Sequence, residues 1–264
     1  MKKYLVIGNP IKHSLSPELH NYWMKQNNIN AIYEKKKLNN NELENLILEV
    51  RKENISGVNV TVPFKKSVIS YLDELSDEAK KTQSVNTIYL KNKKVIGHNT
   101  DIIGFEMAIK KINFDFNNKK VFILGAGGVV PSIVYASMKM GSSKIFISNR
   151  TKVKAEKLKD IFGCIQILDW GDMPNFDVVI NATSLGLNKD DKISLDFSKV
   201  GKNKLFYDLI YNPSETDFLK IGKKLGNQHE NGKLMFIYQA FSAFKLWHGV
   251  EPIINNKVIE LLDK

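Results

Sequence analysis

This chain of 264 residues is poor in cysteine, with Cys164 as the only one. A single cysteine excludes an intrachain disulfide and a cysteine-based zinc site. Long apolar runs are missing too. The first run, residues 4–7, stops at Gly8 and is too short for the core of a secretory signal, and no later stretch approaches the ~20 apolar residues of a membrane span. We therefore expect a cytoplasmic protein.

Arginine is scarce as well. Only Arg51 and Arg150 are found among 39 basic residues, in a chain whose net charge is +11 and whose pI is about 9.4. Specific nucleic-acid binding usually needs clustered positive charge and arginines that contact base edges, whereas the longest lysine run here is residues 35–37. We expect a solvated lysine-rich surface that helps to attract anionic ligands, and neither a nucleic-acid nor a membrane partner.

Apolar residues recur with strand and helix periods in alternation along the chain. In the first part, strands are predicted at residues 3–8, 31–37 and 57–62, a hairpin at 85–90 and 94–97, and helices over 41–51 and from Ser16, which would be the helix cap. In the second part, strands are predicted at 120–124, 144–148, 165–168, 178–181 and 205–209, and helices at 105–112, 153–162 and 234–249. This alternation predicts an α/β fold, with a parallel, doubly wound sheet of the Rossmann type in the second part.

A glycine-rich turn follows the strand predicted at 120–124, where Gly125, Ala126, Gly127 and Gly128 lead into a helix. Glycine permits a tight turn and a close approach of the backbone to a pyrophosphate, and the helix N-terminus supplies amide donors. Val130 stands where the G-x-G-x-x-G pattern has its third glycine, so helix and strand should pack slightly further apart. The strand before the turn and the helix and strand after it predict a dinucleotide site.

The end of the next strand indicates which dinucleotide binds. An NAD enzyme would place Asp or Glu there for the ribose 2′-hydroxyl. This chain has Asn149, Arg150 and Thr151, with Lys154 one helical turn further on. One of only two arginines therefore stands where a guanidinium would bind a 2′-phosphate in bidentate fashion. We predict NADP as the cofactor.

Polar residues also occur in the first part at places where core packing does not require them. Ser14 and Ser16 stand at a strand–helix junction, and Asn59 and Thr61 share one face of a predicted strand with Lys65 just beyond its end. Together with later motifs, and in this order, they resemble the shikimate dehydrogenase family over nearly the whole chain. The matching segments are Ser14-Leu-Ser-Pro, Asn59-Val-Thr-Val-Pro-Phe-Lys65, Ser84-Val-Asn-Thr87, Gly97-His-Asn-Thr-Asp101, Gly125-Ala-Gly-Gly128, Asn149-Arg-Thr151, Asn181-Ala-Thr183, Tyr211-Asn-Pro213 and Tyr238-Gln-Ala240.

The resemblance implies an NADP-dependent oxidoreductase that reversibly reduces 3-dehydroshikimate to shikimate in chorismate and aromatic amino acid biosynthesis. It implies a substrate-binding and catalytic domain at residues 1–101, joined by carboxy-terminal helices at about 236–264, and an NADP-binding domain at 102–235. The active site would lie in the cleft between the two domains.

The resemblance also implies roles for single residues. Lys65 and Asp101 would be the catalytic pair and would contact the substrate. The other substrate contacts would be Ser14 and Ser16 to the carboxylate, and Asn59, Thr61, Asn86 and Gln239 to the hydroxyls. The cofactor contacts would be Gly125, Ala126, Gly127, Gly128, Asn149, Arg150, Thr151, Lys154, Asn181, Thr183 and Gly232. The chemistry agrees, because hydride transfer to a ketone leaves an alkoxide that needs a positioned proton donor. A purely structural ion pair between Lys65 and Asp101 is compatible with that role.

Several alternatives stay open. A quinate/shikimate dehydrogenase that uses NAD(P) is the nearest, and a non-catalytic ligand-binding relative belongs to a different class. A basic nucleic-acid-binding protein would show steeply salt-dependent binding and no turnover. No His and carboxylate pair has the spacing of metal ligands, so we expect no metal. Monomer and homodimer are both open.

Overall fold

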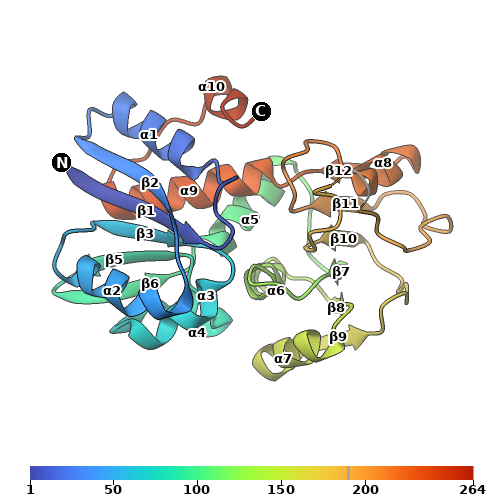
Figure 1. Cartoon of the computed structure of the whole chain (residues 1–264). Coiled ribbons are helices and arrows are strands. Elements are labelled where there is room, and N and C mark those ends of the chain that lie inside the picture. Colours follow the sequence, from blue (N-terminus) through green and yellow to red (C-terminus); the bar gives the residue numbers. More distant parts are fainter. Residues whose placement is uncertain (189–190, 264) are drawn as a thin grey trace. The chain divides into compact units, whose positions relative to one another are not determined.

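The structure, a computed structural model, describes residues 1–188 and 191–263 (Figure 1). Its contacts divide the chain into two compact units, residues 1–104 with 237–262 and residues 105–236 with Asp263. Each unit contains its own six-stranded sheet. Lys189, Asp190 and Lys264, which fall within the predicted domain ranges, lie outside the described residues.

The first unit has a mixed sheet of order β2-β1-β3-β5-β6-β4. Its strands are β1 (Lys2–Gly8), β2 (Ala31–Lys37), β3 (Gly57–Val60), β4 (Glu74–Leu75), β5 (Thr87–Lys91) and β6 (Lys94–His98). β2, β1 and β3 are parallel, while β5 and β6 form the predicted antiparallel hairpin. Because the parallel strands β1 and β3 end at the same edge, the segments that follow them start close together. Those segments carry Ser14, Ser16, Thr61 and Lys65.

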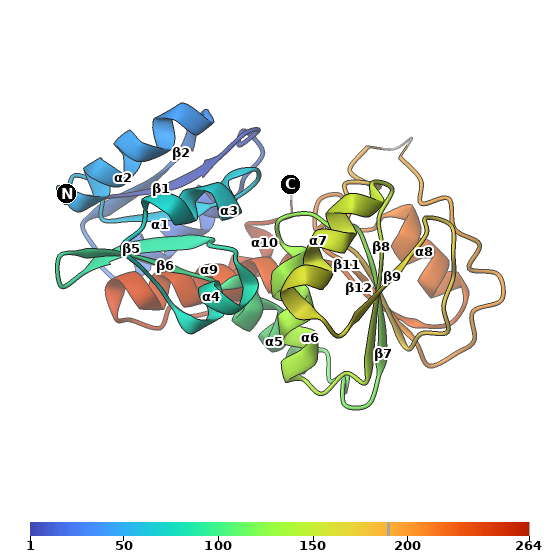
Figure 2. The same ribbon diagram turned by 90° about the horizontal axis from the view of Figure 1, so that it is seen from below.

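Helices cover both faces of this sheet (Figures 1 and 2). A mostly aliphatic core on one face packs against the helices α2 (Leu43–Arg51), α3 (Phe64–Ser67), η2 (Val68–Tyr71) and α4 (Asp77–Thr82). The short helix η1 (Asn40–Glu42) precedes α2 and contributes no buried residue. On the other face, α1 (Ser16–Gln26) and α9 (Lys233–His248) meet through aromatic contacts, such as Trp23 with Phe244. The last helix, α10 (Asn256–Glu260), follows Ile253, whose carbonyl accepts a hydrogen bond from Trp23 Nε1 at 3.1 Å.

His20 is completely buried among these rings, and neither of its ring nitrogens has a hydrogen-bond partner in the described ranges. Burial, with a smaller effect of nearby His248, lowers its pKa from 6.5 to about 3. His20 is therefore neutral in the folded state at pH values where the unfolded chain binds a proton. Its contribution to stability is present above pH 6.5 and is lost as the pH falls toward 3.

We expect denaturant unfolding, followed by tryptophan fluorescence, to show stability that falls by roughly 1 kcal/mol per pH unit below pH 6.5 through His20 alone. Trp23 and Trp247, whose rings lie 5.9 and 5.4 Å from that of His20, report on this unit. His20→Phe should flatten the dependence, and His13→Phe, at an exposed position, should leave it unchanged. Equal slopes in all three proteins would contradict the prediction.

The second unit has an entirely parallel sheet of order β12-β11-β10-β7-β8-β9. Its strands are β7 (Lys120–Leu124), β8 (Lys144–Ser148), β9 (Ile165–Leu168), β10 (Val178–Asn181), β11 (Leu205–Asp208) and β12 (Gln228–Glu230). The helices that connect them are α6 (Val130–Lys139), α7 (Lys152–Phe162) and α8 (Asp217–Lys224), and α5 (Asp101–Lys111) enters the unit from the first one. Numbered within the unit, the strand order is 3-2-1-4-5-6, that of a dinucleotide-binding Rossmann sheet. The predicted fold class is confirmed.

Three local predictions are wrong. Ser16 is not the helix cap but the first residue of α1, because the Ser14 side chain already accepts its N–H at 3.3 Å. The strand predicted to reach residue 62 ends at Val60, although the Thr61 N–H still donates to the Ile7 carbonyl of β1 at 2.9 Å. The helix predicted from residue 105 begins earlier, at Asp101, as α5.

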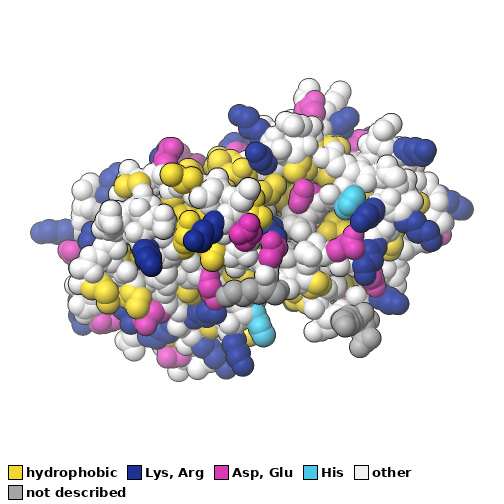
Figure 3. Space-filling model, turned by 90° about the horizontal axis from the view of Figure 1, so that it is seen from above, with side chains coloured by type: hydrophobic (Ala, Val, Ile, Leu, Met, Phe, Trp, Pro, Cys, Tyr) yellow, Lys and Arg dark blue, Asp and Glu magenta, His cyan; other side chains and the backbone are white. Residues whose placement is uncertain are grey.

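The surface agrees with the scattered lysines of the sequence. On the face shown in Figure 3, Lys and Arg side chains are interspersed with acidic and neutral ones and do not form one patch. Within the described ranges, the longest helix is α9 with 16 residues, and no helix has both the length and the hydropathy needed to cross a membrane.

Candidate active site

The buried ion pair of Lys65 and Asp101 is the centre of the polar site in the first unit. Lys65 Nζ lies 2.5 Å from Asp101 Oδ2, and the two residues are only 8% and 5% exposed. Lys65 lies on α3, and its carbonyl accepts the Val85 N–H at 2.8 Å, which fixes its backbone beside the entrance to β5. Asp101 is the first residue of α5, where a carboxylate interacts favourably with the helix dipole. Two segments far apart in sequence therefore present opposite charges to each other.

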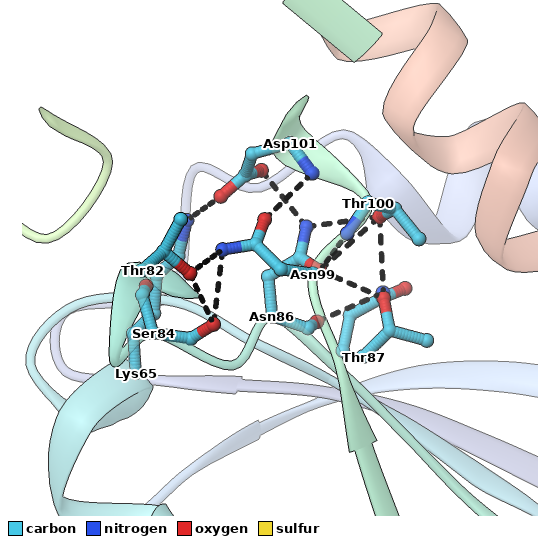
Figure 4. A network of polar contacts seen from close by, with 9 residues as sticks. Lys65, Thr82, Ser84, Asn86, Thr87, Asn99, Thr100 and Asp101 are labelled. Atoms are coloured by element: carbon cyan, nitrogen blue, oxygen red, sulfur yellow. Dashed lines mark hydrogen bonds and ion pairs between the residues drawn. The ribbon is translucent and has the colours of Figure 1, made fainter. Parts of the chain in front are cut away.

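Asparagine side chains hold Asp101 in place (Figure 4). Asn86 Nδ2 donates to the second carboxylate oxygen, Oδ1, at 2.8 Å, and Asn99 Oδ1 accepts the Asp101 N–H at 3.1 Å. Asn99 is itself bonded to Thr82 Oγ1 at 3.1 Å. Asn86 Oδ1 accepts the Thr100 N–H at 2.7 Å, so both the nitrogen and the oxygen of the Asn86 amide make hydrogen bonds. These contacts predict a carboxylate with one orientation rather than a mobile one.

Asn59 is buried, and its side-chain amide also makes hydrogen bonds to other residues of the unit. Its Nδ2 donates to the Asn86 carbonyl at 3.1 Å and to Thr87 Oγ1 at 3.0 Å. Its Oδ1 accepts the hydroxyl of Tyr33 at 2.6 Å. Because an amide has two N–H donors and one oxygen with two acceptor sites, a ligand hydroxyl has only the second acceptor site left. Asn59 can therefore accept a hydrogen bond from a ligand but cannot donate one.

The remaining predicted substrate contacts lie in the same unit. Ser14 Oγ donates to Ser16 Oγ at 3.2 Å, so the two hydroxyls form a pair at the start of α1. Thr61 follows β3 and is half-buried. Gln239 is half-buried on α9, and this part of α9 belongs to the first unit although it follows the second in sequence.

Sequence reasoning missed Tyr33, whose buried hydroxyl donates to Asn59 Oδ1 at 2.6 Å. The only signal for it was an aromatic residue in a strand that otherwise ends in charged residues, Glu34 to Lys37. It also gave no role to Thr87 and Thr100, whose hydroxyls lie 3.2 Å apart within the buried network. Threonine at a strand end is common, so only the three-dimensional contacts distinguish these two residues.

The glycine turn of the second unit lies at the switch point of the sheet, where the strand order reverses between β7 and β10. Gly125 has φ +110°, and an added Cβ would lie 2.8 Å from the carbonyl oxygen of Ala182 beyond β10. At Gly127 an added Cβ meets nothing closer than 3.9 Å. Among the described residues, no hydrogen bond uses the N–H of Ala126 or Gly127. Open space and available amide donors ahead of α6 fit the pyrophosphate of a dinucleotide.

Gly125→Ala is expected to destabilise the second unit by at least about 2 kcal/mol, because alanine is strained at this φ and its methyl group meets backbone. Denaturant unfolding monitored through Trp170, which belongs to this unit, measures the effect. Gly201→Ala is the matched control, since no atom lies within 4 Å of its added Cβ. Similar losses of stability in the two variants would contradict the prediction.

A buried aspartate stabilises the loop after β10 through hydrogen bonds. Asp208, at the end of β11, accepts the Asn181 Nδ2 and the Thr216 hydroxyl at 3.0 and 2.6 Å. Burial raises the pKa of Asp208 to about 6, although these hydrogen bonds lower it. Asn181 Oδ1 in turn accepts the N–H and hydroxyl of Thr183 at 3.1 and 2.7 Å. The Asn181 amide thus shapes the loop. Gly232 packs against the backbone of Leu209 after β11.

The predicted 2′-phosphate residues follow β8. Asn149 Nδ2 donates to the Thr151 carbonyl at 2.8 Å, which forms a tight turn. Arg150 and Lys154 are exposed, and within the described ranges neither has an acidic partner. Lys152 differs, because its Nζ lies 2.6 Å from Asp169. Two unneutralised cations at the end of the second strand of the unit suit an additional phosphate.

Two-domain nicotinamide-dependent oxidoreductases typically combine a Rossmann sheet that carries a glycine turn with another α/β domain. In this chain the other unit, residues 1–104 with 237–262, contains a buried lysine–carboxylate pair among hydroxyl and amide groups. In this chain, residues 6–88 match the family model of the shikimate dehydrogenase substrate binding domain. Residues 106–209 match the model of shikimate / quinate 5-dehydrogenase.

Similar proteins agree with the family models. The chain is 55% identical over 262 residues to the shikimate dehydrogenase (NADP(+)) of Pelagibacter ubique, with 99% of each chain covered. A solved shikimate dehydrogenase in complex with NADP+ is 35% identical, with a TM-score of 0.92 over 100% of this chain and 95% of that one. The enzyme of Thermus thermophilus, in complex with NADP(H) and shikimate, is 30% identical, with a TM-score of 0.89 over 100% and 99%. The chain belongs to the shikimate dehydrogenase family, which confirms the resemblance.

Proposed function

We propose that this chain catalyses the reversible reduction of 3-dehydroshikimate to shikimate with NADPH. The observation that carries the proposal is the buried Lys65–Asp101 pair at the end of a network of buried amide and hydroxyl groups, in the unit that also contains both serines. The unit of residues 1–104 and 237–262 is proposed as the substrate and catalytic domain, and the unit of residues 105–236 as the NADP domain. The expected cytoplasmic location and the place in aromatic amino acid biosynthesis stay predictions.

Lys65 and Asp101 are proposed as the acid/base pair. When bound, NADPH supplies the hydride, so the protein has to supply a proton to the oxygen that becomes the hydroxyl. The Lys65 ammonium has three N–H groups, and Asp101 Oδ2 uses one of them. A second N–H is then available for the substrate oxygen, where the positive charge also stabilises developing alkoxide. Asp101 orients the ammonium group and balances its positive charge.

Recognition of the rest of the substrate is assigned to the neutral polar groups. The hydroxyls of Ser14 and Ser16 are close enough to donate to the same carboxylate. Thr61, Asn86 and Gln239 are proposed to surround the ring hydroxyls, and Asn59 accepts from one of them through its amide oxygen.

For the cofactor, the turn Gly125–Gly128 is proposed to hold the pyrophosphate and Arg150 with Lys154 the 2′-phosphate. The available N–H groups of Ala126 and Gly127 support the first assignment. The absence of acidic partners for both cations in the described part of the chain supports the second. Asn149 and Thr151 form the turn that carries Arg150, and Thr183 and Gly232 complete the carboxyl edge of the sheet.

The nicotinamide absorbance tests the proposal directly, with shikimate or quinate as substrate and NADP or NAD as cofactor. We expect rapid oxidation of shikimate with NADP and little turnover in the other combinations. Equal use of quinate or NAD would move the assignment to a quinate/shikimate dehydrogenase. Folded protein that binds NADP but oxidises neither substrate would indicate a non-catalytic relative.

A further inference from the structure

The Asp208 carboxylate is a buried charge that is held by neutral hydrogen-bond donors. It lies at the carboxyl end of β11 and is 0% exposed. The Asn181 amide and the Ile210 N–H donate to Oδ1, each at 3.0 Å, and the Thr216 hydroxyl donates to Oδ2 at 2.6 Å. No basic side chain in the described part of the chain forms an ion pair with it. Burial raises the pKa of Asp208 to about 6, so the carboxylate is still ionised at neutral pH.

The segments directly after β10, β11 and β12 do not supply a cation that would balance Asp208. Residues 182–188, after β10, carry no charge. The charged groups after the other two strands are already paired, Glu215 with Lys223 and Lys233 with Asp263. Glu230, the last residue of β12, is half-buried and, like Asp208, has no ion-pair partner among the described residues. Two uncompensated carboxylates therefore lie at this edge of the sheet.

The two halves of a Rossmann sheet bind different ends of a dinucleotide. Each half binds one mononucleotide, in the crevice outside the carboxyl ends of its strands. The proposed 2′-phosphate residues, Arg150 and Lys154, follow β8, which assigns the half made of β7, β8 and β9 to the adenosine. The half made of β10, β11 and β12 is left for the nicotinamide (Figure 1). Asp208 and Glu230 lie at the ends of two of these three strands.

Asp208 is separated from the glycine turn by a single loop. Asn181 donates to Asp208 and, through its amide oxygen, accepts the Thr183 N–H and hydroxyl. Between them, the carbonyl oxygen of Ala182 lies 2.8 Å from a Cβ added at Gly125. The carboxylate is thus buried directly behind the loop that borders the proposed cofactor site. A charge surrounded by protein rather than water is only weakly screened, so it acts over several residues.

We propose that Asp208, assisted by Glu230, makes the cofactor site prefer the oxidised form, NADP+, over NADPH. This inference rests on the proposed function. The nicotinamide ring carries a positive charge when oxidised and none when reduced, whereas the phosphates are the same in both forms. A buried negative charge in the nicotinamide half therefore stabilises only the oxidised ring. In the reductive direction NADP+ is the product, so the same preference slows its release and makes it a product inhibitor.

Asp208→Asn tests the charge with a side chain of the same shape. Its amide oxygen still accepts from Asn181 and Ile210, so the loop keeps its support. We expect the calorimetric Kd for NADP+ to rise about three- to tenfold and that for NADPH to stay within about twofold, as for the loss of one weakly screened charge interaction. Inhibition of the reductive reaction by NADP+ should weaken by the same factor. The KM for shikimate should stay unchanged, because the proposed substrate groups belong to the other unit.

Glu215→Gln is the matched control, because it removes an exposed carboxylate after the same strand that is already paired with Lys223. It should keep the wild-type ratio of the Kd values for NADPH and NADP+. If Asp208→Asn does not fold, Glu230→Gln decides, and its ratio should change in the same direction by about twofold.

Two outcomes overturn the inference while wild-type turnover still supports the proposed function. One is a wild-type ratio of the two Kd values in the deciding variant. The other is equal weakening of NADP+ and NADPH binding, which would mean that Asp208 only supports the loop. Wild-type protein that binds neither form of the cofactor removes the inference and the proposed function together.

Discussion

A Lys65→Ala variant is expected to oxidise shikimate roughly a hundredfold to ten-thousandfold more slowly than the wild type, the range found when a positioned proton donor or acceptor is lost. Lys65 is 8% exposed and has Asp101 as its ion-pair partner, so the substitution removes the proposed proton donor from a buried position. The measurement is kcat from the nicotinamide absorbance at saturating shikimate and NADP. NADP binding, followed by calorimetry, should be unchanged, because the glycine turn belongs to the other unit.

Two further variants separate chemistry from folding. Lys66→Ala is the matched control, since it removes a lysine from the same helix at an exposed position and should keep wild-type kcat. Lys65→Ala leaves Asp101 as a buried charge without its ion-pair partner, which itself destabilises a protein. In Lys65→Ala combined with Asp101→Asn, that charge is gone, so the double variant should regain stability but not activity. Substantial turnover in a folded Lys65 variant would refute the assignment of Lys65 as the acid.

Much of the second unit could be predicted from the sequence because its strands are buried on both faces. Four of the predicted strands, 120–124, 144–148, 165–168 and 178–181, have the bounds of β7 to β10. A continuous apolar run between turn residues has few other interpretations. The missed elements, β12 and α8, have weaker signals: β12 has three residues, Gln228–Glu230, without an apolar one. Such a short edge strand is defined by its pairing with β11.

The candidate site was harder to predict, because its chemistry depends on orientation. The family resemblance implied that Asn59 and Asn86 bind substrate hydroxyls, and both residues lie in the buried network of the first unit. Their amide N–H groups, however, donate to other residues of the network, a fact that depends on contacts over 14 to 28 positions of sequence. Tyr33 shows the same limit, since its partner Asn59 is 26 positions away on another strand.

Cofactor choice gives the second large effect. Arg150→Ala is expected to raise the KM for NADP by about tenfold or more, in line with the loss of a charge-assisted contact to phosphate, and to leave kcat nearly unchanged. The KM for NAD should not rise, because NAD lacks the 2′-phosphate. The ratio of kcat/KM values for NADP and NAD therefore isolates this contact from any general damage to the domain.

Lys157→Ala is the matched control for Arg150. It removes an exposed cation from α7, one that lies beyond the turn formed by Asn149 and Thr151. If the general positive charge of the surface attracted NADP, both variants would lose the same amount and high salt would reduce the difference between NADP and NAD. A specific contact predicts instead that only Arg150→Ala lowers the NADP preference. Equal KM values for NADP in Arg150→Ala and wild type would mean that another residue binds the 2′-phosphate. Lys154 is the next candidate, because the nearer Lys152 is paired with Asp169.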